Sequence, residues 1–330
     1  MPVNLAPHTR LLTRHWLLAL WKFSRPHTVI GTSLSVLGLG VMALPSLPFF
    51  PLGPGGLDPS AVAVPEGFYG YFLQLVLVTL VPSLCANIYI VGLNQLVDID
   101  IDRINKPALP LAAGDFSPAQ GRGIVVTTGL LALGLAWMQG YFLFLTVLLS
   151  MAIGTAYSLP PIRLKRFPFW AALCIFGVRG GVVNLGFYQH FRQRLGGAEG
   201  IPAQVWMLTG FVIFFALAIA LCKDIPDQIG DRQFQIRTLT VRMGHRFVFN
   251  LTCWILAACY GGVIIVALLG LPSRQNAVLS ATHGSLLLLL WFRKQRVNLA
   301  SHSQITKFYQ WIWKLFFLEY VLFPFVCLWP

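Results

Sequence analysis

The sequence is poor in charged residues, and in acidic residues above all. Only 11% of its 330 residues are charged, against about 25% in soluble domains. Asp and Glu together number 11, whereas hydrophobic residues make up 56% of the chain. A chain of this composition has too few polar side chains to cover a water-soluble fold. We therefore expect most of it to be solvated by lipid.

The sequence also lacks the patterns of thiolate metal sites and of nucleic-acid binding. Its six cysteines contain no C-x-x-C pair and fall in or beside apolar segments, which is typical of small buried hydrophobic residues. The formal charge of +13 comes from Lys and Arg in short loops, without a continuous basic face or an aromatic stacking platform. We expect no nucleic-acid partner, and nothing in the sequence indicates an obligate protein partner.

Long apolar runs are abundant. A membrane-spanning helix needs about 20 mostly apolar residues. Nine segments meet this measure, at roughly 27–46, 69–93, 122–139, 141–158, 168–188, 204–222, 246–268, 276–292 and 308–328. The sequence therefore predicts an all-α membrane protein, a bundle of nine transmembrane helices with a lipid-open central cavity. No linker is long enough to separate a second domain, so residues 1–330 are expected to form one.

The basic residues predict the orientation of this bundle. With the N-terminus inside, all but four of the 24 Lys and Arg fall on the inner side. The exceptions are Arg192, Arg194 and Arg274 on the opposite side and Arg179 within a span. Because Lys and Arg are enriched in cytoplasmic loops, we expect the N-terminus on the cytoplasmic side and residues 45–67 as the longest outer loop.

The few acidic residues are concentrated in two windows on the inner side. Seven of the 11 lie in or shortly after these windows: Asp98, Asp100, Asp102, Asp115, Asp224, Asp227 and Asp231. The first acidic window, residues 94–102, follows the second span, and the second acidic window, residues 223–232, follows the sixth. In the first window the spacing places Asn94, Asp98 and Asp102 on one face of a helix that continues past the membrane edge, while Asp100 points roughly the other way. In the second window Asp224, Asp227 and Asp231 likewise share one face.

Two such windows on one side predict a cation site and not merely solvated loop ends. Carboxylate oxygens suit Mg²⁺, which retains waters and bridges to substrate phosphates. A metal between two carboxylate pairs would hold a diphosphate, and its positive charge would help the diphosphate leave. Because the site lies at the bilayer edge, the other end of that substrate would be a lipid tail.

Basic residues near the windows are candidates for contacts with the diphosphate oxygens. Tyr157, Arg163 and Lys165 lie in or beside the inner loop after the fourth span, Arg232 follows Asp231, and Arg25 precedes the first span. Each also fits an ordinary inner loop or a membrane anchor that carries positive charge, so the spacing alone leaves both interpretations open.

Arg179 and Asn184, both candidates for binding the substrate, lie well inside the fifth predicted span. An intramembrane arginine costs several kcal/mol and normally faces a cavity or a partner. Neighbouring glycines would permit close helix approach. If the substrate carries a carboxylate, Arg179 is the first candidate to bind it. A structural ion pair is the alternative.

The two windows resemble the paired motifs of UbiA-type membrane prenyltransferases. Residues 94–102, NQLVDIDID, fit that family's N-x-x-x-D-x-x-x-D motif, and residues 223–232, KDIPDQIGDR, fit its second D-x-x-x-D motif. The family's usual Y-x-x-x-K pattern is absent, since Lys165 follows Tyr157 by eight positions. The resemblance implies a Mg²⁺ and diphosphate site formed by Asn94, Asp98, Asp102, Asp227 and Asp231, with Asp224 as a further metal ligand.

Four stretches are more specifically similar to homogentisate prenyltransferases of photosynthetic organisms. They are residues 94–117, 178–187, 223–240 and 313–320, the last of which reads WKLFFLEY. The cyanobacterial phytyltransferases of that group are most similar. The resemblance implies transfer from phytyl diphosphate to homogentisate, with loss of CO₂ and formation of 2-methyl-6-phytyl-1,4-benzoquinol in tocopherol biosynthesis. It also implies a plasma or thylakoid membrane of a photosynthetic bacterium, with the active site on the cytoplasmic side.

Several alternatives stay open at this point. Within the family they are a homogentisate solanesyltransferase, a chlorophyll synthase or a 4-hydroxybenzoate prenyltransferase, because the motifs do not measure the length of the prenyl tail. In a different class, a membrane transporter could also carry carboxylates. Those would be expected nearer the bilayer midplane than its edge.

Overall fold

The computed structural model describes residues 7–44, 65–197, 200–234, 236, 238–270 and 273–328, and within these ranges it contains helices and no strand. The long helical segments are α1 (Pro7–Phe23), α2 (Pro26–Ala43), α3 (Phe68–Val97), α6 (Pro118–Gln139), α7 (Tyr141–Ser158), α8 (Pro168–Phe176), η3 (Gly177–Val182), α9 (Val183–Leu195), α10 (Ala203–Lys223), α13 (His245–Leu269), α14 (Arg274–Gln295) and α15 (His302–Leu328). Short helices connect them: α4 (Ile99–Asn105), α5 (Pro110–Ala113), η2 (Leu164–Arg166), α11 (Gln228–Gln233) and α12 (Leu239–Met243).

Eight helical segments among the described residues are long and apolar enough to cross a membrane. They coincide with eight of the nine predicted spans, and α8, η3 and α9 together form one of them. The remaining predicted span corresponds to α14, which has 22 residues but a less apolar sequence. The predicted outer loop 45–67 falls almost entirely outside the described residues.

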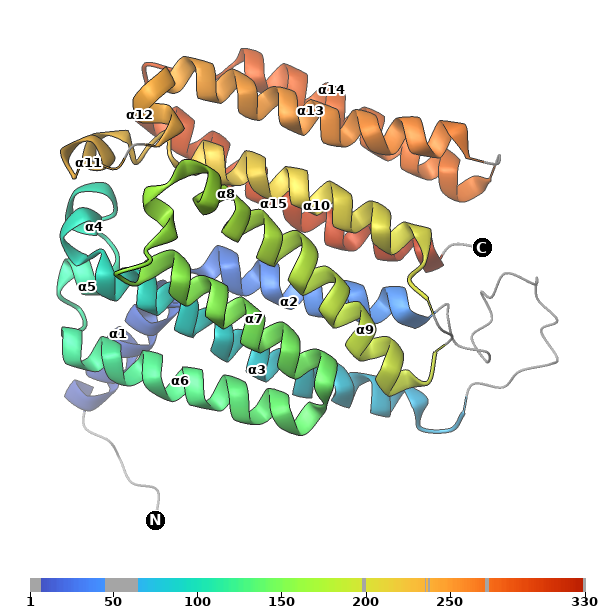
Figure 1. Ribbon diagram of the computed structural model, residues 1–330, viewed down its shortest axis with the longest axis horizontal. Coiled ribbons are helices and arrows are strands. Elements are labelled where there is room, and N and C mark those ends of the chain that lie inside the picture. Colours follow the sequence, from blue (N-terminus) through green and yellow to red (C-terminus); the bar gives the residue numbers. More distant parts are fainter. Residues whose placement is uncertain are drawn as a thin grey trace.

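The long helices run roughly alongside one another, and α10 lies near the middle of the bundle (Figure 1). It packs against α8, η3, α13 and α15, while α2 packs against α9 and α15. Aromatic side chains fill the centre, among them the fully buried Phe215, Tyr260 and Phe316. In lipid such packing, rather than exclusion of water, holds helices together. It produces a framework on which side chains at the helix ends keep fixed positions.

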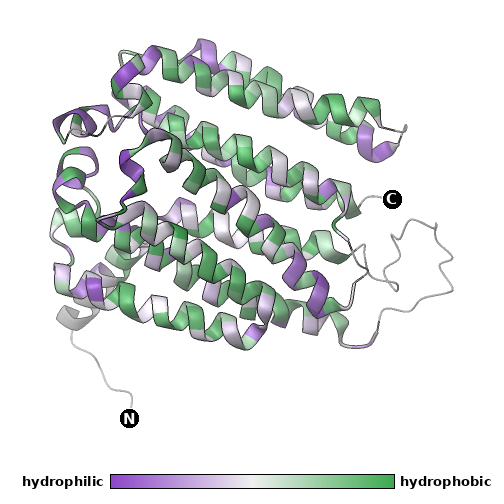
Figure 2. Ribbon diagram, viewed as in Figure 1, coloured by the Kyte–Doolittle hydropathy of each residue, from purple (hydrophilic) through white to green (hydrophobic). Residues whose placement is uncertain are grey.

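The short helices α4, α5, α11 and α12 gather at one end of the bundle, on the left in Figure 1. Figure 2 shows polar residues concentrated there, while the bodies of the long helices are mostly hydrophobic. Helices α4 and α11 contact each other. The fold therefore brings together the two acidic windows, which are more than 100 residues apart in the sequence.

Neither window is the uninterrupted helix that the spacing predicts. Helix α3 ends at Val97, and α4 begins after Asp98, whose φ of −111° and ψ of 20° leave the helical region. Helix α10 ends at Lys223, and a turn precedes α11. The Asp98 N–H nevertheless still donates to the Asn94 carbonyl at 3.1 Å, and the Asp102 N–H donates to the Asp98 carbonyl at 2.8 Å. The change of direction thus preserves the alignment of the first set of acids.

Candidate functional site

Asp98 is the centre of a polar network at the first acidic window. Its Oδ2 accepts a hydrogen bond from the Asn94 amide at 3.1 Å, and its Oδ1 accepts one from Arg163 at 3.0 Å. Lys165 forms an ion pair with the same carboxylate. Arg25 reaches the Asn94 side-chain oxygen at 3.5 Å. Three of the residues singled out in the sequence thus contact one buried carboxylate, and Arg25 contacts one of these three.

The loop between α7 and α8 supplies two of these contacts. Arg163 has a left-handed backbone, with φ of +39°, and η2 follows directly. This local turn directs both Arg163 and Lys165 toward Asp98. Burial lowers the pKa of Lys165, while the neighbouring carboxylate of Asp98 acts in the opposite direction. Both basic residues therefore lie against the carboxylate of the first acidic window.

The second acidic window is crowded with negative charge. Asp224 follows α10 and lies 3.6 Å from the Lys223 ammonium, and Asp227 pairs with Lys106, which follows α4. Burial raises the pKa of Asp224. Burial, together with the charges of Asp224 and Asp227, raises the pKa of Asp231 to about 7. Among the described residues these three carboxylates have two lysine partners, Lys106 and Lys223. A further cation bound among the carboxylates would therefore be favoured.

Asn105 joins the two windows directly. Its side-chain oxygen accepts a hydrogen bond from the Gly230 N–H at 3.0 Å, and its amide donates to Asp231 at 3.4 Å. A Cβ at position 230 would lie only 2.3 Å from that oxygen. The close approach of α4 and α11 therefore requires glycine at position 230, and Asn105 fixes the orientation of the Asp231 carboxylate.

The donor chemistry of these residues fits Mg²⁺. The Oδ2 atom of Asp102 is buried without a hydrogen-bond partner in the described part of the chain, and burial raises the pKa of this group. A buried carboxylate oxygen without a partner costs free energy unless a cation or a hydrogen-bond donor binds to it. Within the described ranges no three acidic, histidine or cysteine side chains already form a metal cluster, and Lys106 and Lys165 neutralise two of the aspartates instead.

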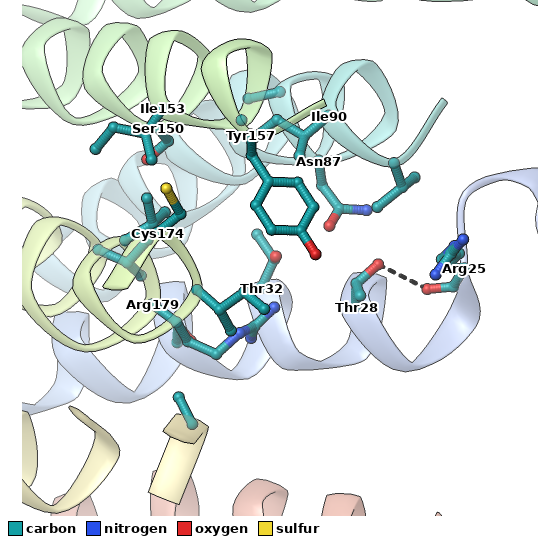
Figure 3. A pocket seen from close by; sticks show the side chains of 18 of the residues that line it. Arg25, Thr28, Thr32, Asn87, Ile90, Ser150, Ile153, Tyr157, Cys174 and Arg179 are labelled. Atoms are coloured by element: carbon teal, nitrogen blue, oxygen red, sulfur yellow. Dashed lines mark hydrogen bonds between the residues drawn. The ribbon is translucent and has the colours of Figure 1, made fainter. Parts of the chain in front are cut away.

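Both windows line a polar cavity of about 110 Å³ that adjoins a larger, mainly apolar one of about 270 Å³. Six residues line both cavities: Arg25, Asn94, Tyr157, Ile175, Ala220 and Lys223. The larger cavity extends between α2, α3, α7, α10 and α15 and is shown in Figure 3. The arrangement can accommodate a molecule with an anionic head among the aspartates and an apolar body between the helices.

Arg179 lines the larger cavity from η3, a π-helical turn. Its guanidinium carbon lies 5.3 Å from the Trp313 ring centroid and 5.4 Å from that of Phe316, distances at which cation–π attraction operates. It pairs with no carboxylate among the residues that the structure describes. In Figure 3 its side chain extends toward Thr32, in the cavity that the Tyr157 ring enters from α7.

Two predicted substrate-binding residues lie elsewhere. Asn184 is fully buried, accepts a 2.6 Å hydrogen bond from Tyr320 and lines neither cavity. Arg232 is exposed and also lines neither. Conversely, Asn105 and Lys106 line the polar cavity but were not predicted as site residues from the sequence. Their positions three and four residues after Asp102 place them on the same helical face, which is the signal that would have found them.

Comparison with known proteins adds family information to this geometry. The family described as "UbiA prenyltransferase family" matches residues 60–318. A homogentisate phytyltransferase of Synechocystis is 50% identical over 311 residues, which are 94% of this chain and 96% of that protein. A chloroplastic homogentisate phytyltransferase of Arabidopsis thaliana is 40% identical over 93% of this chain and 75% of its own length.

A solved structure also has this fold. A UbiA homologue from Archaeoglobus fulgidus, bound to GPP and Mg²⁺, superposes with a TM-score of 0.60 and 19% sequence identity. The match covers 93% of this chain and 99% of that one. At this identity the similarity concerns the architecture of the bundle.

Proposed function

The chain belongs to the UbiA prenyltransferase family, and we propose that it transfers a phytyl group from phytyl diphosphate to homogentisate. The observation that carries this proposal is the meeting of a carboxylate-lined polar cavity with an apolar cavity that extends between the helices. The similarity to homogentisate phytyltransferases over nearly the whole chain supports the choice of donor and acceptor.

We propose that Mg²⁺ binds between the two acidic windows. Asp98 and Asp102 would hold it on one side, and Asp227 and Asp231 on the other, with Asp224 as a further ligand. When bound, the metal neutralises charge on the diphosphate and so assists cleavage of the C–O bond. The unpartnered Asp102 oxygen and the raised pKa of Asp231 support this assignment.

Metal binding would change the partners of the basic residues. Lys106 and Lys165 now neutralise Asp227 and Asp98, which are two of the proposed metal ligands. With those carboxylates engaged elsewhere, the two ammonium groups and Arg163 would be available for the oxygens of the diphosphate. Arg25, Asn94 and Tyr157 line both cavities and are proposed to bind the substrate at their junction. The positions of Asn184 and Arg232 argue against direct contact.

The apolar cavity would hold the start of the prenyl chain and shield it from water. An allylic carbon that loses diphosphate is electron-poor, and water would capture it before the intended acceptor. The helices around this cavity exclude water, while the electron-rich hydroquinone ring of homogentisate attacks. The ring proton and CO₂ are then lost, a proton is added at the side-chain carbon, and the product is 2-methyl-6-phytyl-1,4-benzoquinol.

We further propose that α14 is a ninth span, that the N-terminus is cytoplasmic, and that residues 1–330 form one domain. His283 of α14 and Glu319 of α15 are fully buried and lie 3.2 Å apart, which supports insertion of α14 alongside the other helices. The acidic windows would then face the cytoplasm from a plasma or thylakoid membrane. No obligate protein partner is proposed.

Product analysis tests the reaction. Purified protein would receive homogentisate with phytyl, geranylgeranyl or solanesyl diphosphate, in Mg²⁺ or in EDTA, and products would be identified by mass. We expect the phytylated quinol to dominate and to require Mg²⁺. A preference for solanesyl diphosphate would instead identify a solanesyltransferase. Transfer only to chlorophyllide or 4-hydroxybenzoate would overturn the choice of acceptor.

A further inference from the structure

We propose that Arg179, Trp313 and His27 form an acceptor subsite that selects an aromatic ring bearing a carboxylate. This inference rests on the proposed function, and it names the residues that would select the acceptor. All three side chains line the larger cavity, from three helical segments far apart in the sequence. In this subsite the guanidinium binds the carboxylate, and the two aromatic rings contact the acceptor ring.

Arg179 carries a charge that no acidic side chain among the described residues balances with an ion pair. Arg179 belongs to a membrane-spanning segment, and its guanidinium borders the larger cavity. Its aromatic neighbours supply cation–π attraction, but they donate no negative charge. An arginine at membrane depth is costly unless it meets a partner. A carboxylate ligand would supply that partner, with the two parallel hydrogen bonds that a guanidinium forms best.

The backbone around Arg179 is built to present this side chain. It belongs to the π-helical turn η3, and such turns often occur at functional sites. The turn packs closely on α10, because a Cβ on Gly180 would lie 2.3 Å from a side-chain carbon of Ile213. On the opposite helix, a Cβ on Gly31 would lie 3.0 Å from Nη1 of Arg179. The glycine at position 180 therefore allows η3 to pack against α10, and the glycine at position 31 leaves room for the guanidinium.

Trp313 brings the other two groups together. The His27 ring centroid lies 4.9 Å from that of Trp313, with the planes inclined by 57°. The guanidinium carbon of Arg179 lies 5.3 Å from the same indole. An acceptor that packs beside the indole would thus meet a cation and an imidazole. The imidazole can hydrogen-bond to a phenolic hydroxyl. A neutral hydrocarbon would form no hydrogen bond with the imidazole and no ion pair with the guanidinium.

The subsite also has a suitable position relative to the diphosphate. Arg179 lines only the apolar cavity, whereas Arg25, two residues before His27, lines both cavities. A carboxylate bound by Arg179 is therefore separated from the diphosphate held among the aspartates. The acceptor ring would lie between the two anionic groups and adjoin the start of the prenyl chain. This placement allows two anions to occupy one site with little mutual repulsion.

The test compares acceptors with and without a carboxylate. Steady-state transfer from phytyl diphosphate to homogentisate would be measured for the wild type and for Arg179→Gln. Competitive inhibition by 2-methylhydroquinone, which lacks the carboxylate, would be measured for both proteins. We expect the KM for homogentisate to rise about 10- to 100-fold in Arg179→Gln, the loss that follows removal of a charge-assisted hydrogen-bond pair. The inhibition constant of 2-methylhydroquinone should stay within about twofold.

Three further variants separate the subsite from a purely structural role. Arg179→Lys should restore part of the lost affinity, because it keeps the charge but not the planar fork. Gly31→Ala should raise the same KM by displacing Nη1. Arg194→Gln removes an exposed charge near the end of α9 and should leave all constants unchanged. Thermal unfolding in detergent would verify that each variant is folded.

The outcomes distinguish this inference from the function beneath it. A wild-type protein that transfers no phytyl group to homogentisate would overturn the proposed function and the subsite together. An active wild type whose Arg179→Gln variant keeps the KM for homogentisate would overturn the subsite alone. Equal losses of affinity for homogentisate and for 2-methylhydroquinone would also overturn it, since they would indicate that Arg179 merely shapes the cavity.

Discussion

Replacement of Asn105 by alanine tests whether the two acidic windows act as one site. The Asn105 side chain accepts from the Gly230 N–H at 3.0 Å and donates to Asp231 at 3.4 Å. Alanine removes both contacts and leaves a peptide N–H without its partner. The first contact is a neutral hydrogen bond and the second involves a carboxylate, so together they contribute about 2–3 kcal/mol.

That free energy would be lost mainly from metal binding. Asn105 is not a proposed metal ligand, but it orients Asp231, which is one. Removal of such an orienting contact typically lowers metal affinity about 10- to 100-fold. We expect the Mg²⁺ concentration for half-maximal activity of Asn105→Ala to rise by this factor. The KM for homogentisate should stay unchanged, because the acceptor would bind at the other end of the cavity.

The assay is a titration of phytyl transfer against free Mg²⁺, with Mn²⁺ binding measured independently by electron paramagnetic resonance. Asp100→Asn is the matched control. Asp100 lies on the same short helix, but its side chain is 75% exposed and pairs with Arg103. A folded Asn105→Ala protein with wild-type dependence on Mg²⁺ and wild-type Mn²⁺ affinity would refute the joint site.

Three further predictions concern other parts of the molecule. Asp98→Asn and Asp227→Asn should each reduce turnover at least about 1,000-fold with little change in melting temperature; substantial residual activity in either would contradict the metal role. In EDTA, the raised pKa of Asp231, about 7, means that the folded chain retains a proton that the unfolded chain releases. The free energy of unfolding should therefore fall as the pH rises from about 5 to about 8, and it should fall less in Asp231→Asn. Calorimetry at several pH values measures this dependence, and a wild-type stability that does not change over this range would contradict the reasoning. His283→Ala should lower the free energy of unfolding by about 3–5 kcal/mol, because it leaves Glu319 buried without its partner; a chemical denaturation curve that matches the wild type would refute this.

Much of the architecture could be predicted from the sequence because lipid imposes simple requirements. Apolar segments of sufficient length must form helices, and eight of the predicted spans are present in the described residues. The expected all-α fold is confirmed. The π-helical turn inside the fifth span was not predictable, because it depends on how Gly180 packs against Ile213, a contact between segments that the local pattern does not specify.

The candidate site was partly predictable for a similar reason. The repeated aspartates stand out in a sequence with few acids, and the structure places Asp98, Asp102, Asp227 and Asp231 around one cavity. Their partners were harder to find. The spacing places Asn105 on the same helical face as Asp102, but its partner Asp231 lies 126 positions away, and no local pattern indicates that pairing. Asn184 looked similar to Arg179 in the sequence, yet it faces Tyr320 and not the cavity.

The most direct test of the proposed function uses homogentisate labelled at its carboxyl carbon. The purified protein would be incubated with this acceptor and phytyl diphosphate, with Mg²⁺ or EDTA, while labelled CO₂ and phytylated product are counted together. We predict release of one CO₂ per phytyl group transferred, in Mg²⁺ only. Phytyl transfer without release of labelled CO₂, or equal activity in EDTA, would contradict the account.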